Sequence, residues 1–128
     1  MGIPILILGE SGSGKSASLR NLDPDSAVII QAVSKLLPFK SSFKKRSQEN
    51  PKGQILVTDR SQEIIKIING AAKAGRKVIC IDDFQYTMAN EFMRRTLDKE
   101  TGNAAFAKYN EIAKNAWDII MAIQALPS

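Results

Sequence analysis

The sequence GESGSGKS, Gly9 to Ser16, directly follows the short apolar run PILIL, Pro4 to Leu8. It matches the pattern G-x-x-x-x-G-K-[ST] at every fixed position. Glycines allow backbone conformations in which several N–H groups point at one anion. The lysine adds a cation to such a loop, and the last serine adds a hydroxyl oxygen. This stretch therefore predicts a loop that holds phosphate groups, between a buried strand and a helix.

Each position of the loop has an expected role. Lys15 is the predicted catalytic lysine because it can reach the β- and γ-phosphates, and the Ser16 hydroxyl is a predicted Mg²⁺ ligand. A helix expected over Lys15 to Leu22 would direct its positive end at the same phosphates. The predicted nucleotide-binding residues are Gly9, Glu10, Ser11, Gly12, Ser13, Gly14, Lys15, Ser16 and Ala17.

The same loop also fits a second pattern. Gly12, Gly14 and Ala17 match G-x-G-x-x-[GA], which is typical of dinucleotide-binding folds. Those folds need an acidic residue at the end of the second strand, where it binds the ribose. Here that strand ends at Gln31 and is followed by Ala32. The dinucleotide interpretation is therefore rejected.

A second motif is KVICIDDF, Lys77 to Phe84, in which an apolar strand runs into two aspartates. A carboxylate at this place can hold Mg²⁺ beside a phosphate-binding loop, so Asp82 is a predicted metal ligand. Asp83 is the predicted catalytic group that positions or deprotonates the attacking water. An alternative for Asp83 is the N-cap of a helix that begins at Phe84.

Strand and helix patterns alternate along the chain, which predicts an α/β fold with a mostly parallel sheet flanked by helices. The expected strands are Pro4–Leu8, Ala27–Gln31, Gln54–Thr58 and Lys77–Ile81. A helix is expected between a cap at Asp59 and Gly75, with Gln62 completing a capping box. Two further helices are expected over Phe84–Leu97 and Ala104–Ala125. The last helix should bury an apolar stripe of Phe106, Tyr109, Ile112, Ala113, Ala116, Trp117, Ile120 and Ile123.

Composition excludes several classes of protein. A chain of 128 residues suits a single domain, 1–128, and 24% charged residues without a long apolar run argue against a membrane protein. The lack of histidine excludes His-based catalytic and metal sites. Cys80, the one cysteine, is expected to be a small buried residue in a reducing compartment. No export signal is evident, so a cytoplasmic location is expected.

A basic segment extends from Ala32 to Gly53. It contains six Lys and Arg residues and one acidic residue, a balance of +5 that equals the formal charge of the whole chain. Phe39 and Phe43 lie among these cations, and charges with aromatic rings are typical of single-stranded nucleic-acid binding. DNA contacts are predicted at Lys40, Lys44, Lys45 and Arg46. The alternative is a solvated connector whose phenylalanines pack onto the domain.

With both motifs identified, the chain resembles P-loop ATPases of the RecA/AAA-type division, whose Walker A and Walker B motifs correspond to GESGSGKS and KVICIDDF. More narrowly, it resembles small phage-encoded AAA-type ATP-binding proteins, the group of the phage single-strand annealing ATPases. The resemblance implies ATP and Mg²⁺ as cofactors, a role in phage DNA recombination or replication in the host cytoplasm, and a homo-oligomer.

The chain departs from that family in two ways. The AAA pattern usually has Asp-Glu after the Walker B strand, whereas this chain has Asp82-Asp83, which predicts slow hydrolysis or another base. The resemblance also predicts a further strand beside Pro4–Leu8, but the sequence ends after a helix, at Ala125–Ser128. We therefore expect this chain to be the amino-terminal part of a longer protein, so that the C-terminal strands of the fold are missing from it.

Two other functions fit the same loop. One is a small-molecule kinase, although the segment DKETGN, Asp98 to Asn103, lacks the arginines of a typical kinase lid. The other is a nucleotide-dependent switch with little hydrolysis. Arg94 and Arg95 have two interpretations as well, either as exposed helix charges or as a finger on a neighbouring subunit's γ-phosphate.

Overall fold

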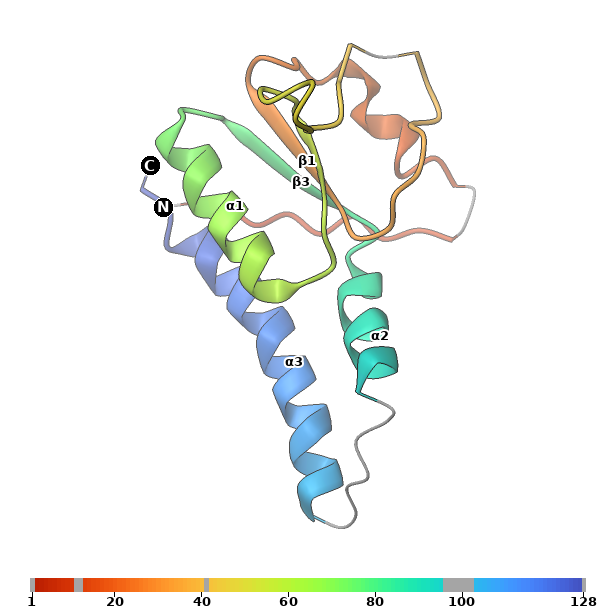
Figure 1. Ribbon diagram of the computed structural model, residues 1–128, viewed down its shortest axis with the longest axis vertical. Coiled ribbons are helices and arrows are strands. Elements are labelled where there is room, and N and C mark those ends of the chain that lie inside the picture. The colour runs from red at the N-terminus through yellow and green to blue at the C-terminus, as the bar shows by residue number, and fades with distance from the viewer. Residues whose placement is uncertain (1, 11–12, 41, 96–102, 128) are drawn as a thin grey trace.

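The computed structural model describes residues 2–10, 13–40, 42–95 and 103–127 of the chain. Within them it is an α/β structure with a three-stranded parallel sheet, three α-helices and one short 3₁₀ helix (Figure 1), so the expected α/β class is confirmed. The elements in chain order are η1 Ala17–Asn21, β1 Ala27–Gln31, β2 Ile55–Val57, α1 Ser61–Lys73, β3 Val78–Asp82, α2 Gln85–Arg94 and α3 Asn103–Gln124.

The sheet has the order β2-β1-β3, with β1 in the centre and parallel to both neighbours. All five residues of β1 are buried, as its continuous apolar sequence predicts. Three expected strands are confirmed, with ends that differ by at most one residue. In the register, Gln31 lies opposite Val57 of β2 and Asp82 of β3. The C-terminal ends of the three strands therefore meet at one edge of the sheet.

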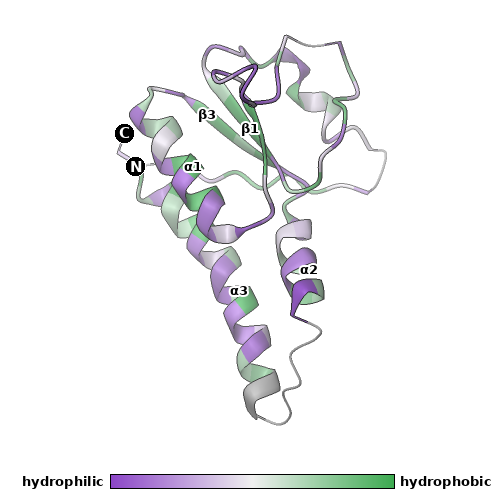
Figure 2. Cartoon of the chain, viewed as in Figure 1, coloured by the Kyte–Doolittle hydropathy of each residue, from purple (hydrophilic) through white to green (hydrophobic). Residues whose placement is uncertain are grey.

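One face of the sheet is covered by α1 and α3, which lie side by side (Figure 1). Strands β1 and β3 are largely green in Figure 2, whereas α1 and α3 alternate green and purple along their length, as expected for helices with one apolar face. This main core consists of Val28, Ile30, Ile64, Ile68, Ala71 and Ile119. Burying each of its large side chains stabilises the fold by about 1.5–3 kcal/mol, so these two helices hold the sheet in place.

The opposite face has a smaller core and no α-helix of the described residues against it. Its buried members are Ala27, Ile29, Phe43 and Ile55. Leu19 and Leu22, at the 3₁₀ helix, pack against them. The segment that follows β1 contributes Phe43. The loops that carry the predicted site residues therefore also close this side of the sheet.

The ends of α1 follow the sequence only in part. Gly75 has a φ of +79° just beyond the helix, as expected for a C-terminal glycine. The N-cap, however, is Arg60 and not Asp59, and no side chain makes a cap hydrogen bond there, so the predicted capping box with Gln62 is wrong. Instead, the amide of Arg60 donates to Oγ1 of Thr58 at 3.2 Å. The backbone turns one residue later than the pattern suggested.

The expected strand Pro4–Leu8 is absent from the structure, which gives residues 2–10 no regular secondary structure. The side chains of Ile3, Ile5, Leu6, Ile7 and Leu8 are 61–82% exposed. A strand needs a neighbour that accepts and donates its backbone hydrogen bonds. No strand among the described residues pairs with this segment, and an apolar sequence alone does not supply that partner.

The predicted helix after the loop is shorter and tighter than expected. Residues Ala17–Asn21 form a 3₁₀ helix, in place of an α-helix over Lys15 to Leu22. The amide of Leu19 donates to the carbonyl of Ser16 at 3.2 Å, which is the i to i+3 spacing of a 3₁₀ turn. The sequence Asp23-Pro24 ends the segment, because the residue before proline avoids the helical region.

The two later helices are confirmed, but the predicted apolar stripe of α3 is partly wrong. Ile112, Ala116 and Ile119 are buried, whereas Phe106 and Trp117 are exposed. Helix α3 packs against α1 at one end and against α2 at the other, where Tyr109 stacks on Phe92 with ring centroids 5.7 Å apart. Residues 96–102, which include the end of the expected Phe84–Leu97 helix and most of the DKETGN segment, lie outside the described residues.

Candidate functional site

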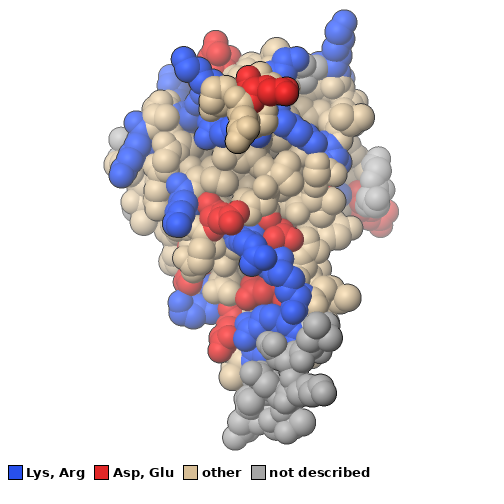
Figure 3. Space-filling model, in the orientation of Figure 1, with Lys and Arg blue, Asp and Glu red and all other residues tan. Residues whose placement is uncertain are grey.

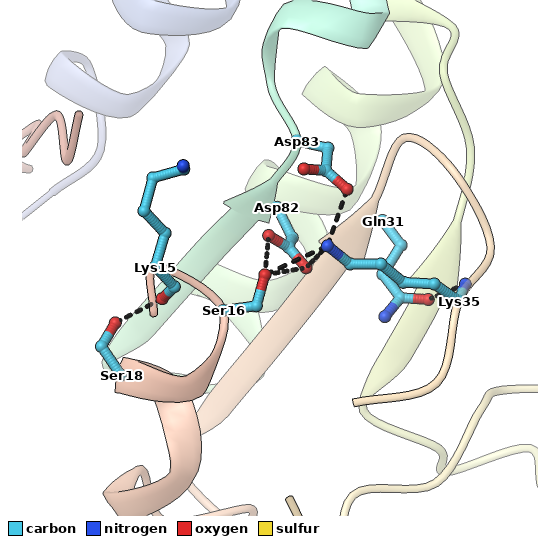
Figure 4. Close-up of polar contacts among 7 residues, drawn as sticks. All are labelled: Lys15, Ser16, Ser18, Gln31, Lys35, Asp82 and Asp83. Atoms are coloured by element: carbon cyan, nitrogen blue, oxygen red, sulfur yellow. Dashed lines mark hydrogen bonds and ion pairs between the residues drawn. The ribbon is translucent and has the colours of Figure 1, made fainter. Parts of the chain in front are cut away.

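The two sequence motifs meet at the C-terminal edge of the sheet. Ser16 lies at the N-terminus of the 3₁₀ helix, and Asp82 is the last residue of β3. The Ser16 hydroxyl donates to Oδ1 of Asp82 at 2.9 Å and lies 3.2 Å from Oδ2 (Figure 4). The side chain of Asp82 is only 9% exposed. Both predicted metal ligands, 66 residues apart in the sequence, are thus within direct contact of each other.

A lysine that the motifs did not single out joins this pair. Nζ of Lys35, in the loop after β1, lies 3.1 Å from Oγ of Ser16 and 3.2 Å from Oδ2 of Asp82 (Figure 4). It also lies 2.8 Å from Oδ2 of Asp83. We call Ser16, Lys35, Asp82 and Asp83 the Lys35 cluster. Sequence analysis counted Lys35 only as part of the basic segment. The signal that could have indicated its role is its position four residues after Gln31, because Gln31 ends β1, the strand next to β3.

The two carboxylates keep Lys35 charged. Partial burial alone would lower its pKa, but the hydrogen bonds and charges of Asp83 and Asp82 outweigh that effect. The pKa of Lys35 therefore lies above its ordinary value. At neutral pH the Lys35 cluster contains an ammonium group between two carboxylates and a hydroxyl.

Asp83 turns into the site through an unusual backbone conformation. Its φ is +57°, in the left-handed region that aspartate tolerates better than most residues. The N-cap of α2 is Phe84, and no side chain makes a cap hydrogen bond there. The alternative role of Asp83 as a helix cap is therefore contradicted, and its carboxylate instead faces Lys35.

The predicted phosphate-binding loop curls over its own lysine. Nζ of Lys15 donates to the carbonyl oxygens of Gly9 at 2.5 Å and Glu10 at 2.8 Å. Its side chain points away from Ser16 and Asp82 (Figure 4). Gly14 has a φ of +95°, a conformation that favours glycine. Lys15 is thus held at the loop, apart from the Lys35 cluster.

The loop leaves several amide groups available. The amide of Ser13 donates to the carbonyl of Glu10 at 3.1 Å. In the described part of the chain, no hydrogen bond uses the amides of Gly14, Lys15 or Ser16. Amides of this kind fit the oxygens of a bound phosphate. Ser11 and Gly12, also predicted to bind nucleotide, lie outside the described residues.

The oxygens of the cluster fit a magnesium ion. Carboxylate and hydroxyl oxygens are the ligands that Mg²⁺ prefers, and it usually takes one or two carboxylates and completes its shell with water and phosphate. The Lys35 ammonium already places a cation among these oxygens. Within the described residues no group of three or more His, Cys, Asp or Glu side chains forms a metal site of its own.

Gln31 is a second polar residue beside the site that sequence analysis did not assign. It is fully buried, and its Nε2 has no hydrogen-bond partner among the described residues. Its Oε1 lies 3.5 Å from the amide of Lys35, at the limit of a weak hydrogen bond. Because Gln31 lies opposite Asp82 in the sheet, an unpaired buried donor sits next to the cluster.

We expect Gln31→Met to stabilise the protein by about 1 kcal/mol, because it replaces a buried donor that lacks a partner with an apolar group of similar length. Urea unfolding would measure the difference. Gln62→Met, on the exposed face of α1, is the matched control and should change the free energy of unfolding by less than about 0.5 kcal/mol. A loss of stability in Gln31→Met would show that Nε2 has a partner that stabilises the fold.

Cys80, which was expected to be a small buried residue, is only partly buried. It lies in β3 and packs against the smaller core. Burial raises the pKa of its thiol, and the negative charge of Asp82 adds to the effect. The thiol is therefore protonated at neutral pH and is a poor nucleophile.

The basic segment meets the Lys35 cluster through Lys35 itself and through Ala32, whose amide donates to the carbonyl oxygen of Asp82 at 3.4 Å. Lys40, Lys44, Lys45 and Arg46 are exposed. Lys45 forms an isolated parallel bridge with Ile55, so residues on either side of it border the sheet beside β2. Phe43 is buried in the smaller core. Of the two interpretations of this segment, Phe43 therefore agrees with the one in which the phenylalanines pack onto the domain.

The two arginines after β3 make intramolecular ion pairs. NH1 of Arg94 lies 2.9 Å from Oδ1 of Asp59, which precedes α1. NH2 of Arg95 lies 2.6 Å from Oε2 of Glu111 on α3. These contacts join α2 and the residue after it to Asp59 and to α3, and they favour helix charges over a finger as the role of both arginines.

Comparison of the chain with protein-family models, with curated proteins and with solved structures found no match in any of the three. The site therefore has to be interpreted from its own geometry. No helix in the described ranges is long and apolar enough to cross a membrane.

Proposed function

We propose that this protein binds a nucleoside triphosphate together with Mg²⁺ and hydrolyses it slowly. The observation that carries the proposal is the 2.9 Å contact between Ser16 and Asp82, which joins the phosphate-binding loop to the acidic end of β3. A phosphate-binding loop next to a carboxylate is the arrangement that nucleoside-triphosphate chemistry requires. ATP is the proposed nucleotide because the sequence resembles P-loop ATPases.

The roles follow from the positions of the residues. The free amides near Gly14 and the ammonium of Lys15 would bind the phosphate oxygens, after Lys15 leaves the carbonyls of its own loop. Ser16 and Asp82 would hold Mg²⁺, which when bound offsets the charge that develops on the phosphoryl oxygens. Asp83 would orient the attacking water and accept its proton.

One contact favours a second candidate, a nucleotide-dependent switch with little hydrolysis. The carboxylate of Asp83 is 2.8 Å from Lys35, so the oxygen that would contact the attacking water is already taken by the ammonium group. Water activation therefore requires Lys35 to move. A small-molecule kinase has no such support, since no described residue indicates an acceptor site.

A DNA partner remains a proposal that rests on charge. Lys40, Lys44, Lys45 and Arg46 are exposed and can contact phosphates, but with Phe43 buried only Phe39 is left to stack on a base. In Figure 3, basic side chains are spread over the visible face with acidic ones between them. This distribution fits a weak, salt-sensitive contact better than a dedicated groove. Homo-oligomer formation rests on the resemblance alone.

The test is Mg²⁺-ATP binding and turnover, with and without single-stranded DNA. We expect Lys15→Ala to lower turnover by about 100-fold, the effect of losing one preorganised donor to the phosphates. Lys73→Ala, at the exposed end of α1, is the matched control and should leave turnover unchanged. Failure of the unaltered protein to bind Mg²⁺-ATP would refute the proposal. Tight binding without turnover would select the switch.

A further inference from the structure

We propose that Lys35 is a built-in cation that occupies the divalent-metal position of the nucleotide-free protein, where it competes with Mg²⁺ for Ser16 and Asp82 and also holds Asp83. The inference extends the proposed metal site, and its test does not need nucleotide. It concerns a residue outside both sequence motifs.

The geometry of the ammonium group resembles a coordination shell. One nitrogen lies 3.1 Å from Oγ of Ser16, 3.2 Å from Oδ2 of Asp82 and 2.8 Å from Oδ2 of Asp83. An ammonium group has three donors, so these contacts use all of them. The three oxygens come from the loop, from the end of β3 and from the turn after it. Lys35 thus joins the same segments that a bound metal would join.

Charge explains why a cation is needed there. The carboxylates of Asp82 and Asp83 belong to adjacent residues and are 9% and 22% exposed. Two carboxylates this close repel each other unless a cation lies between them. In the described part of the chain, each ion pair of these two aspartates involves Lys35. Without this lysine the pair would require another cation.

The two cations exclude each other. Mg²⁺ needs oxygens at about 2.0–2.1 Å in near-octahedral order, and the Lys35 nitrogen lies in the space between the same oxygens. The side chain of Lys35 is 33% exposed and extends from a segment without helix or strand, so it can swing out on its flexible stem. Metal binding would then also free Asp83 to hold the attacking water. Lys35 therefore makes hydrolysis depend on prior metal binding.

The first measurement is the affinity for Mn²⁺ without nucleotide, monitored by electron paramagnetic resonance at fixed ionic strength. We expect Lys35→Met to bind Mn²⁺ about tenfold more tightly than the unaltered protein, because the competing charge is gone. Lys35→Arg keeps the charge and should behave like the unaltered protein. Lys40→Met, an exposed lysine of the same segment, controls for net charge. Equal or weaker Mn²⁺ binding by Lys35→Met than by Lys40→Met would overturn the proposal.

A thermal melt gives a second readout. Without divalent ions, Lys35→Met should melt at a lower temperature than the unaltered protein, and Mg²⁺ should raise its melting temperature more than that of the unaltered protein. If Lys35→Met is unfolded without metal, Mg²⁺ should refold it, whereas NaCl at equal ionic strength should not. Equal responses of the two proteins to Mg²⁺ would also overturn the proposal.

These outcomes are separate from those that test the proposed function. If the unaltered protein binds no Mg²⁺-ATP but Lys35→Met gains affinity for Mn²⁺, the nucleotide proposal fails and the role of Lys35 stands. If Mg²⁺-ATP binds and Mn²⁺ affinity does not depend on Lys35, only the role of Lys35 fails.

Discussion

Replacing Asp82 with Asn is expected to lower Mg²⁺-dependent ATP turnover by about 100-fold or more, while the fold stays intact. Asparagine has nearly the same shape as aspartate and can still accept the hydrogen bond from Ser16, which is 2.9 Å long in the unaltered protein. It lacks the negative charge that would hold a metal ion beside the phosphates. Steady-state turnover over a range of Mg²⁺ concentrations would measure the effect, and the fitted Mg²⁺ requirement should rise.

The control is Asp118→Asn on α3, which removes a carboxylate of an exposed ion pair with Lys114 far from the site. Exposed pairs of this type contribute about 0–1 kcal/mol, so turnover should not change. Circular dichroism should show native helix content in both variants. Full turnover by Asp82→Asn at low Mg²⁺ would mean that Asp82 is not the metal ligand, and the proposed mechanism would then fail.

The sequence was most informative where one strong pattern decided the structure. The run AVIIQ, Ala27 to Gln31, could only be a strand buried on both faces, and it is the central strand of the sheet. The run that ends at Asp82 is the neighbouring strand, and its carboxylate lies at the predicted edge. Ser16 and Asp82 belong to separate motifs, and they come together because the 3₁₀ helix that begins after Ser16 packs on the sheet through Leu19 and Leu22. Local pattern and global fold agree at these positions.

The contacts of Lys35 could not be predicted in the same way. Its position depends on the path of a loop without regular structure, and nothing in the residues next to it indicates two carboxylates about 50 positions later. Capping has a similar limit. Asp59 suits the N-cap of α1, but the N-cap is Arg60, one residue later, and the Arg60 amide donates to Thr58. Helix ends and loop contacts are therefore the features that sequence alone determines least.

The apolar stripe of α3 was misjudged for a different reason. A single stripe assumes one packing partner, but this helix meets α1 along one part and α2 along another. Ile119 is among the most deeply buried side chains, although the expected stripe omitted it, while Trp117 is exposed. An apolar residue at helical spacing thus becomes core only where another element lies opposite it.

The same principle makes a testable contrast between two isoleucines. Ile30 is fully buried in β1, within the core beneath α1 and α3, while Ile5 is 81% exposed in the segment that was expected to be a strand. Ile30→Ala should therefore lower the free energy of unfolding by about 2–5 kcal/mol, through lost burial and a cavity. Ile5→Ala should change it by less than about 0.5 kcal/mol. Urea denaturation of both variants would measure these differences.

The loss of stability in Ile30→Ala should also affect the Lys35 cluster. Ile30 precedes Gln31, which lies opposite Asp82, so a cavity beneath Ile30 loosens the edge of the sheet that holds the Lys35 cluster. At temperatures where Ile30→Ala is still folded, we expect weaker Mg²⁺-ATP binding than in Ile5→Ala. A large loss of stability in Ile5→Ala would contradict the exposed placement of residues 3–8 and would restore the buried strand predicted from the sequence. A small loss would mean that the site is held by the three-stranded sheet and its two covering helices, without help from the segment that precedes Gly9.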